Sequence, residues 1–260
     1  MDQDYMNYEL IVVDDGSSDG SVSVIEAFKK EFPSIIFIKL EENIGICKAF
    51  NIAFKICSGD YIIDLAADDI LHSNRISRGV EIFGRLDDDY GVIFGDAEWI
   101  NEDGTLLHLH SDRFPHDAVP QGNIYKDVVE RYFICSPTMI FRRTVVERLH
   151  GYNDALTYED FDFWIRSSRY FKYFYDPVVL VKKRKVKNSL SHMQFKVLNK
   201  HSFSTYLVCA KILELNRSTE ERKALSNRLQ YEMRQCIRIL DIRLAFKYAL
   251  LLIKNNSMQY

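Results

Sequence analysis

Two adjacent carboxylates follow a short apolar run that has the character of a β-strand. The run is Tyr61–Leu65, bounded by Gly59, and the carboxylates are Asp68 and Asp69. Ligands of open α/β sheets bind outside the carboxyl ends of strands, and carboxylates held there suit a hard divalent cation that in turn holds a phosphate. The alternative is that one of the two aspartates only caps a helix beginning near Ile70.

A second acidic group lies far along the chain, at Glu159–Asp162. The helical spacing of Phe161, Trp164 and Ile165 gives this stretch an apolar face, and Trp164 is interpreted as a core residue. Acidic residues are favoured in the first turn of a helix, so helix electrostatics alone would explain them. The two acidic groups together could instead divide the work of a transfer reaction, with one holding a metal and the other removing a proton.

Regular alternation of strands and helices is predicted around these groups. The apolar run 8–13 ends in the acidic turn cluster 14–20, and further strands are predicted at 35–40 and 61–65. Helices are predicted at 21–32 and 46–57, and the first of them is expected to bury a stripe formed by Val22, Ile25, Ala27 and Phe28. This alternation indicates βαβ units and a parallel sheet.

The middle of the chain continues the α/β pattern. Helices are predicted at 74–86, 127–133 and 144–149, strands at 91–94, within 135–143 and at 173–182, and a hairpin joins 98–100 to 105–109. The polar loop 110–122 is expected to be a flap beside the acceptor, because long loops in compact domains tend to be functional. The basic run from Lys182 to Lys187 is typical of a solvated face, with phosphate or anionic lipid as alternative partners.

Size and composition favour one large α/β domain with a helical appendage. The chain has 260 residues, is 47% hydrophobic and carries a net charge of −3, so no basic field indicates a nucleic-acid partner. Five cysteines without a C-x-x-C pair indicate a reduced, cytoplasmic protein. No signal peptide is recognised, and the longest apolar run, Tyr248–Ile253, is too short to span a bilayer.

The character of the sequence changes at about residue 191, where three helices are predicted at 192–215, 218–239 and 241–254. The last helix has a broad apolar surface beside Arg243, Lys247 and Lys254. It could dock on the domain, on a partner or on a membrane surface, and docking on the domain is the expected arrangement.

Several motifs together resemble those of family 2 glycosyltransferases over roughly residues 5–190. The matching segments are Val12–Gly20, Asn43–Gly45 before a helix, Gly59–Ile62 leading into Asp68 and Asp69, Gly95 and Asp96 before Asp103 and Gly104, and Tyr158–Trp164. Any one of these segments alone would be a weak signal, whereas their order and spacing are specific.

The resemblance implies a GT-A type α/β domain at 1–190 with a mostly parallel central sheet flanked by helices, followed by a C-terminal helical extension at 191–260. It also implies a divalent metal, Mn²⁺ or Mg²⁺, and sugar transfer with inversion. By motif, Asp160 would be the general base, Asp69 and Asp68 would hold the metal, and Asp15 would accept from the base edge of a uracil-type nucleotide. The residues implied around the nucleotide sugar are Asp14, Asp15, Lys48, Asp68, Asp96 and Arg184.

Three departures from the family pattern are visible. Ala66 stands where most members carry the leading carboxylate of an Asp-x-Asp-Asp motif, and Lys183–Val186 replaces a Tyr-Arg-x-His stretch of which only Arg184 remains, with His192 as a conceivable substitute. Members of the family normally begin with a further strand and helix, so a βα unit of roughly 30 residues is expected to be absent. Its absence would leave two strand edges unpaired.

The leading hypothesis is an inverting glycosyltransferase that moves a sugar from a UDP-sugar donor to a glycan or a lipid-linked acceptor. The family resemblance implies bacterial surface-polysaccharide synthesis in the cytoplasm, with peripheral contact to the inner face of the membrane through the last helix. One alternative is a degenerate, non-catalytic binding protein. Another is a nucleotidyltransferase, which the acidic rather than basic turn after the first strand disfavours.

Overall fold

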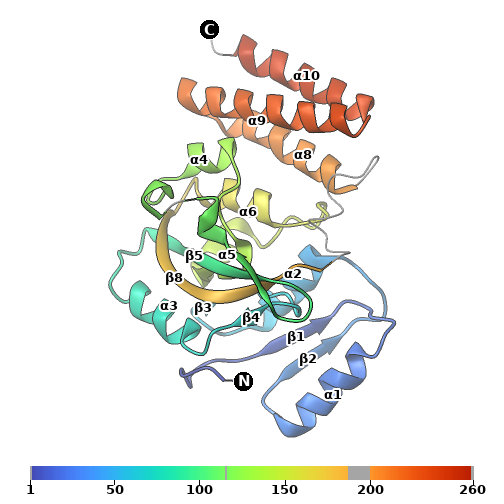
Figure 1. Cartoon of the computed structure of the whole chain (residues 1–260), viewed down its shortest axis with the longest axis vertical. Helices are drawn as coiled ribbons and strands as arrows, with labels where there is room; N and C mark the ends of the chain where they lie inside the picture. Colours follow the sequence, from blue (N-terminus) through green and yellow to red (C-terminus); the bar gives the residue numbers. More distant parts are fainter. Residues whose placement is uncertain (1, 115, 187–199, 259–260) are drawn as a thin grey trace.

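The computed structural model describes residues 2–114, 116–186 and 200–258. The strands are β1 Ile11–Asp14, β2 Ile36–Lys39, β3 Tyr61–Ile62, β4 Ile70–Leu71, β5 Tyr90–Ile100, β6 Leu106–Leu109, β7 Ile140–Arg142 and β8 Lys172–Arg184. The α-helices are α1 Ser21–Glu31, α2 Ile46–Ile56, α3 Arg75–Phe83, α4 Tyr125–Glu130, α5 Arg143–Leu149, α6 Asp160–Ser167, α8 Lys200–Leu215, α9 Thr219–Arg238 and α10 Ile242–Ser257. Figure 1 shows α8–α10 stacked beyond α4 and α6, which lie between them and the strands.

The central sheet is mixed, and the prediction of a mostly parallel sheet is corrected. A six-stranded sheet has the order β3-β7-β5-β8-β4, with β6 on β5, and within it only β5 and β8 run parallel. The pairs β3–β7, β4–β8, β5–β7 and β5–β6 are antiparallel. The reason lies in the connections: β5 and β6 are joined by the tight turn at Asn101–Gly104, which reverses the chain, whereas a helical crossover would preserve its direction.

A separate two-stranded parallel sheet is formed by β1 and β2. Among the described strands, β1 pairs only with β2 and β3 pairs only with β7, so each has one edge without a ladder. Glu9 joins the two sheets near these edges, because its carboxylate accepts from the backbone N–H groups of Ser58 (2.6 Å) and Gly59 (2.9 Å).

The segment after the first acidic pair is a strand, so the helix-cap interpretation of Asp68 or Asp69 is wrong. Ile70 and Leu71 form β4, which pairs with Lys182 and Val181 of β8. Helix α3 begins only at Arg75, and β3 is shorter than predicted. Pairing across the sheet therefore overrides the local preference that suggested a helix here.

The predicted buried stripe of the first helix is also wrong. No residue of α1 is fully buried, and the side chains of Val24 and Phe28 are 59% and 50% exposed. The helix lies beside the small β1–β2 sheet (Figure 1), which offers too little surface to cover an apolar face.

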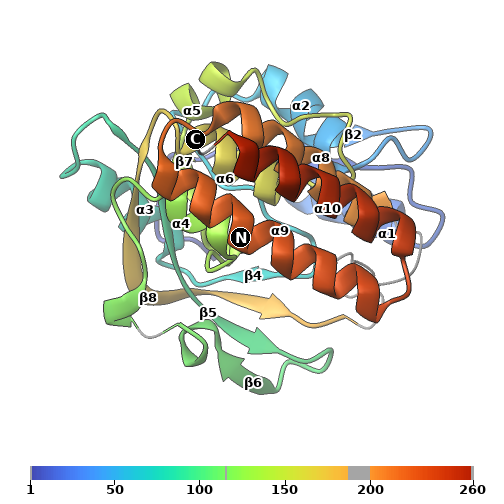
Figure 2. The same cartoon turned by 90° about the horizontal axis from the view of Figure 1, so that it is seen from above.

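The larger of two hydrophobic clusters runs from the sheet into the C-terminal helices, which lie over α4 and α6 when the molecule is seen from above (Figure 2). It includes Phe94 of β5, Phe161 of α6, Val208 of α8 and Tyr248 of α10. The predicted division at 190/191 and His192 lie in 187–199, outside the described residues, and the two-domain division stays a prediction. The three predicted tail helices are present, and α10 docks on its neighbours through Leu244, Tyr248 and Leu251.

All five cysteines are free thiols. Among the helices of the described segments, none combines the length and the apolar character needed to cross a membrane.

A buried ion pair joins α9 to the rest of the fold. Arg228 and Glu232 are 2% and 6% exposed, and their Nη1 and Oε1 atoms lie 3.3 Å apart. Arg228 also donates through Nε to the carbonyl of Val129 at the end of α4 (3.0 Å), and its guanidinium lies 4.0 Å from the ring centre of Tyr132. This arginine therefore holds α9 against the end of α4 and the segment that follows it.

Removing only one member of this pair is expected to be costly. The Glu232→Ala variant would leave the Arg228 guanidinium buried without its carboxylate, which should lower the free energy of unfolding by about 3–5 kcal/mol. Urea unfolding of the two proteins measures the difference. The matched control is the double variant Arg228→Met/Glu232→Leu, which should lie within about 1 kcal/mol of the parent or above it. A single variant as stable as the parent would contradict this account.

Candidate functional site

The Asp68–Asp69 turn is fastened to the end of β8 by Arg184. The backbone N–H of Arg184 donates to Asp69 Oδ1 (2.8 Å), and its Nε donates to the carbonyl of Asp68 (3.1 Å). Its Nη1 reaches the carbonyls of Asn101 and Glu102 in the β5–β6 turn. Arg184 therefore holds two loops together, and its predicted role at the nucleotide sugar stays a prediction.

The acidic pair offers a partial ligand set for a divalent metal. Among the described residues, no group of three or more His, Cys, Asp or Glu side chains is arranged to hold a metal ion. Two carboxylates nevertheless fit an ion that takes its remaining ligands from substrate phosphates and water, as Mg²⁺ commonly does. Asp69 keeps lone pairs for this purpose, although burial raises its pKa against the opposing effect of the Arg184 N–H.

The second acidic group forms a cluster of carboxylates at the start of α6. The Oδ1 atom of Asp160 is buried and has no hydrogen-bond partner among the described residues. Burial, followed by the charges of Asp160 and Asp64, raises the pKa of Glu159 well above its usual range. Burial also raises the pKa of Asp64 to about 6, a hydrogen bond from Tyr152 opposes this rise, and the charge of Asp160 adds to it.

Tyr152 positions Asp64 within this cluster. Its hydroxyl donates to Asp64 Oδ2 (3.0 Å), and its ring stacks on Phe50 of α2 with 3.9 Å between ring centres. The side chain of Asn51 bonds both the N–H and the carbonyl of Tyr152 (2.8 and 2.9 Å). A β-carbon at Gly151, where φ is +85°, would lie 2.4 Å from Asn51 Oδ1, so this close approach requires glycine.

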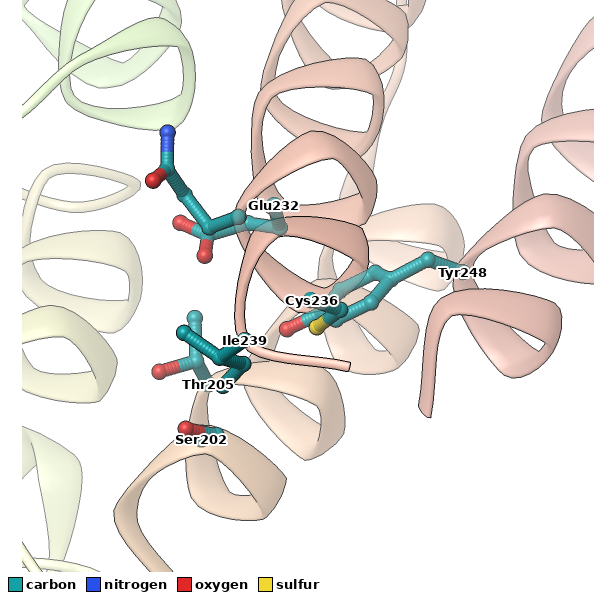
Figure 3. Close-up of a pocket in the computed structure, with 7 residues that line it drawn as sticks. Ser202, Thr205, Glu232, Cys236, Ile239 and Tyr248 are labelled. Atoms are coloured by element: carbon teal, nitrogen blue, oxygen red, sulfur yellow. The ribbon is translucent and has the colours of Figure 1, made fainter. Parts of the chain in front are cut away.

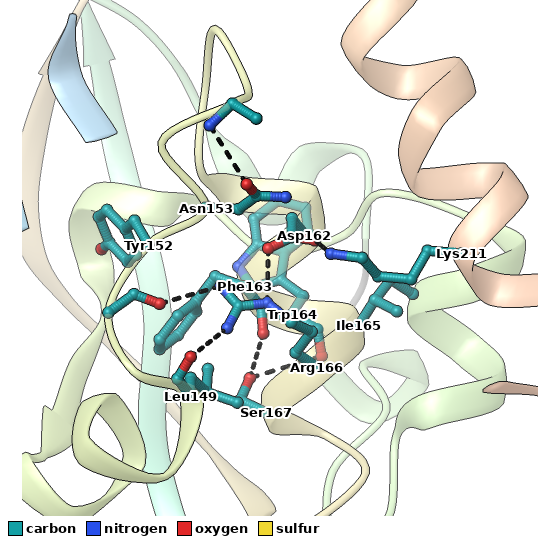
Figure 4. Close-up of polar contacts among 12 residues, drawn as sticks. Leu149, Tyr152, Asn153, Asp162, Phe163, Trp164, Ile165, Arg166, Ser167 and Lys211 are labelled. Atoms are coloured by element: carbon teal, nitrogen blue, oxygen red, sulfur yellow. Dashed lines mark hydrogen bonds and ion pairs between the residues drawn. The ribbon is translucent and has the colours of Figure 1, made fainter. Parts of the chain in front are cut away.

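Asp162 is a structural ion-pair partner, so first-turn helix electrostatics is not its main role (Figure 4). Its carboxylate is 1% exposed and lies 2.5 Å from Arg166 Nε and 2.6 Å from Lys211 Nζ. Arg166 also donates to the carbonyls of Leu149 and Gly151. Asp162 thus ties α6 to α8 and to the preceding loop, and it is not free to act as a base.

The first acidic segment packs on the start of α2. Asp15 accepts from the backbone N–H groups of Ile44 (2.8 Å) and Gly45 (2.9 Å), which places its charge at the N-terminus of that helix. Asp14 is buried and accepts from the N–H of Ser17 (3.0 Å). The structure therefore brings together two motifs that are separate in the sequence, and Lys48 is exposed one turn into α2.

Asp96 lies at the polar loop 110–122. Its Oδ1 accepts from the N–H groups of Ala97 (2.8 Å) and Ser111 (2.9 Å), and its buried Oδ2 has no hydrogen bond among the described residues and lies 4.0 Å from His116 Nε2. Burial raises the pKa of the Cys135 thiol to about 11, the charge of Lys183 opposes this rise, and the charges of Asp69, Asp160 and Asp96 add to it.

Sequence reasoning did not single out Asp64 or Tyr152, and it named Lys183 only within the basic run from Lys182 to Lys187, for which phosphate was one alternative partner. A carboxylate inside an apolar strand run was a visible signal for Asp64. Nothing in the local sequence distinguishes Tyr152 from the many other aromatic residues, or Lys183 from its basic neighbours.

Two small cavities are present in the described part of the chain, and only the second is lined by a residue of the acidic motifs, Asp96. One lies between α8, α9 and α10 and is lined by Thr205, Glu232 and Tyr248, among others (Figure 3). The other lies behind β5, beside Asp96, Thr138 and Asp176. Each has room for about one water molecule, so neither is a nucleotide pocket.

The mixed sheet, its flanking helices and the acidic turns at strand and helix ends define a GT-A type glycosyltransferase fold. Residues 1–149 match the family model described as Glycosyl transferase family 2, and the chain belongs to this family.

Named relatives agree with this assignment. An uncharacterized glycosyltransferase of Rickettsia conorii is 29% identical over 185 residues, which are 70% of this chain and 30% of that protein. The chain thus spans less than a third of the length of this relative. TuaG of Bacillus subtilis, provisionally named as a teichuronic acid biosynthesis glycosyltransferase, is 26% identical over 204 residues, covering 78% of this chain and 77% of its own.

Solved structures share the fold at low sequence identity. S. aureus TarS in complex with UDP-GlcNAc matches with a TM-score of 0.62 and 15% identity, covering 100% of this chain and 86% of that one. The mannosyltransferase PcManGT from Pyrobaculum calidifontis, in complex with GDP-Man and Mn²⁺, matches with a TM-score of 0.63 and 15% identity, covering 98% and 68%.

The raised pKa of Asp64 predicts a specific pH dependence of stability. Between its ordinary value of 3.8 and about 6, the folded chain binds more protons at this carboxyl than the unfolded chain does. The free energy of unfolding should therefore fall as the pH rises through this window. Relative to Asp64→Asn, the parent should lose on the order of 1–3 kcal/mol between about pH 4.5 and about pH 7 in urea unfolding.

The Tyr152→Phe variant is a second test, because it should enlarge the pH dependence that Asp64→Asn removes. It removes the hydrogen bond that stabilises the Asp64 carboxylate, so the pKa of Asp64 should rise further and the pH dependence should extend upward. If the parent and Asp64→Asn gave parallel stability curves, Asp64 would not carry this titration.

Proposed function

We propose that this chain transfers a sugar from a UDP-sugar donor to an acceptor hydroxyl with inversion at the sugar carbon. The observation that supports the proposal is that two acidic groups far apart in the sequence, represented by Asp69 and Asp160, both act electrostatically on the same buried thiol, that of Cys135. The unpartnered Oδ1 of Asp160 is available on one side, and the Asp68–Asp69 turn is available on the other.

In the proposed reaction, Asp160 is the general base. The acceptor oxygen attacks the anomeric carbon from the face opposite the diphosphate and forms the new C–O bond. Its proton passes to the Asp160 carboxylate as the bond from the anomeric carbon to the diphosphate oxygen breaks, with the electron pair leaving on UDP. Attack opposite the leaving group inverts the anomeric configuration, and base catalysis of this kind contributes about 10²–10⁴-fold.

The donor would lie along the other acidic segments. Asp15 and Asp14 shape the turn beside α2, Lys48 lies on the exposed first turn of that helix, and Asp68 would lie by the ribose. Arg184 would act mainly by fixing the Asp68–Asp69 turn, and Asp96 by ordering the polar loop 110–122 as an acceptor-side flap. Asp69 and Asp68 would hold Mn²⁺ or Mg²⁺, which when bound would neutralise charge on the diphosphate.

A glycan or lipid-linked acceptor in surface-polysaccharide synthesis is the setting that the relatives suggest. The name of TuaG associates that protein with teichuronic acid biosynthesis. A nucleotidyltransferase is disfavoured because the turn after β1 is acidic, with Asp14 and Asp15 already bonded to backbone N–H groups. The competing hypothesis is a degenerate, non-catalytic binding protein, and release of UDP from a donor distinguishes it from a transferase.

Peripheral contact with an anionic membrane is proposed for α10. Ile242, Phe246, Leu250 and Ile253 recur at helical spacing along its outer face and are 60%, 63%, 51% and 65% exposed. Residues 200–260 carry eleven Lys and Arg against five Asp and Glu, although the whole chain has a net charge of −3. An exposed apolar stripe beside basic side chains fits an anionic lipid surface better than a second copy, because self-pairing would bring like charges together.

Binding of UDP and turnover test the transferase proposal. The parent should bind UDP more tightly with Mn²⁺ than without it in calorimetric titration, and it should release UDP from at least one of UDP-glucose, UDP-galactose and UDP-N-acetylglucosamine. Asp160→Asn should lower kcat by about 10²–10⁴-fold and leave UDP affinity nearly unchanged, because the base acts on the acceptor proton and not on the nucleotide.

The matched control for this prediction is Asp162→Asn, which alters a neighbouring carboxylate that is locked in ion pairs. It should lower thermal stability, and it should lower kcat of the folded fraction far less than Asp160→Asn does, because the altered carboxylate holds the turn and takes no proton. Undiminished turnover of Asp160→Asn would contradict the base assignment. A parent that binds UDP and never releases it from a donor would favour the degenerate alternative.

Vesicle sedimentation tests the membrane contact. The parent should bind vesicles that contain phosphatidylglycerol, bind pure phosphatidylcholine vesicles more weakly, and lose affinity as salt rises. The double variant Phe246→Gln/Ile253→Gln should bind at least about 10-fold more weakly, because it removes two large apolar side chains from the stripe.

Leu106→Gln, which alters an apolar residue of β6 that is 55% exposed, is the control and should bind vesicles as the parent does. Concentration-dependent dimers that the double variant abolishes, without any binding to vesicles, would assign the stripe to a second copy instead.

A further inference from the structure

Lys183 differs from its neighbours on β8 in where its ammonium lies. Lys182 Nζ lies 3.6 Å from Glu98, and Arg184 is fastened to the acidic turn. Side chains alternate along a strand, so Lys183 projects to the opposite face, where its Nζ lies 5.1 Å from the ring centre of Trp99. In the described ranges of the chain, this ammonium makes no hydrogen bond or close ion pair.

The charges of both acidic groups act on the ammonium of Lys183. Burial lowers its pKa, but this effect is outweighed by Cys135 and by the charges of Asp160, Asp69 and Asp68, so the pKa is raised overall and the group stays charged. These charges belong to both acidic groups, the turn before β4 and the start of α6. Lys183 also directly precedes Arg184, whose N–H donates to Asp69 Oδ1 (2.8 Å), so its backbone lies beside the Asp68–Asp69 turn that the proposed function assigns to the donor.

We propose that Lys183 binds the diphosphate of the donor and neutralises it as it leaves. This inference rests on the proposed function. A diphosphate entering a centre formed by Asp68, Asp69 and Asp160 meets only like charges unless a cation accompanies it. Arg184 cannot easily supply that cation, because its Nε and Nη1 atoms are bonded to loop carbonyls, whereas the ammonium of Lys183 is available.

Ala66 stands where most members of the family have the first carboxylate of their acidic motif, so this chain has one carboxylate fewer for a metal. One fewer carboxylate weakens the hold on a divalent metal, and a fixed ammonium supplies positive charge that does not depend on metal concentration. The expected consequence is a component of UDP affinity that persists when metal is removed and that belongs to Lys183.

Calorimetric titration of UDP and UMP into the parent, Lys183→Met and Lys183→Arg, each with Mn²⁺ and with EDTA, tests the proposal. Lys183→Met should weaken UDP binding by about 10- to 100-fold, the amount expected for one charge-assisted contact, and UMP binding by less. The loss should be greater in EDTA. Lys183→Arg keeps the charge and should retain most of the affinity.

The matched control is Lys182→Met, which removes the adjacent lysine on the opposite face and should leave UDP affinity within about 2-fold of the parent. Thermal unfolding of each variant establishes that it is folded. Equal UDP affinity of folded Lys183→Met and the parent would overturn this inference and leave the proposed function standing. A folded parent that binds neither UDP nor UMP under any condition would overturn both. If Lys183→Met did not fold, the proposal would be decided by Lys183→Gln under the same criteria.

Discussion

The constraint on which the site depends is the repulsion among carboxylates that share a partly buried region. Asp64, Glu159 and Asp160 lie close enough that each charge affects the ionisation of another, and Asp69 adds a further charge from the opposite side. Like charges in a medium of low dielectric cannot all be ionised without compensation. The surrounding structure compensates in three ways: the raised pKa values of Asp64 and Glu159 favour their neutral forms, Tyr152 donates a hydrogen bond, and Lys183 supplies an ammonium.

The C-terminal helices α8 and α9 hold the first turn of α6, which carries part of this carboxylate group. Lys211 of α8 pairs with Asp162 and thereby fixes the first turn of α6, which presents Asp160. Arg228 of α9 packs over the ring of Phe161 in the same turn, with 5.2 Å from its guanidinium carbon to the ring centre. Both faces of the turn are thus held by cations from the extension. The helical part of the chain therefore positions the proposed base in addition to completing the core.

The sequence was most informative where a local pattern determines local structure. The boundaries of α2 and β2, the hairpin at Asn101–Gly104 and the core position of Trp164 were predicted correctly because periodicity and turn chemistry act over a few residues. Strand direction, the exposure of α1 and the environment of Lys183 were not predicted. Each depends on which distant strand or helix lies alongside, and Lys183 has the same local sequence character as its solvent-facing neighbours.

Contacts between distant residues also hold the β1–β2 sheet, the proposed donor side, to the rest of the molecule. The β1–β2 sheet shares no ladder with the six-stranded sheet among the described strands, so backbone pairing does not connect them. Two carboxylates contribute to that connection instead: Glu9 accepts from Ser58 and Gly59, and Asp15 accepts from Ile44 and Gly45. Charge-assisted bonds of this kind are stronger than neutral ones but fix orientation less firmly than a continuous sheet. The position of the first acidic turn relative to Asp160 therefore depends on two carboxylates as well as on the packing of α2.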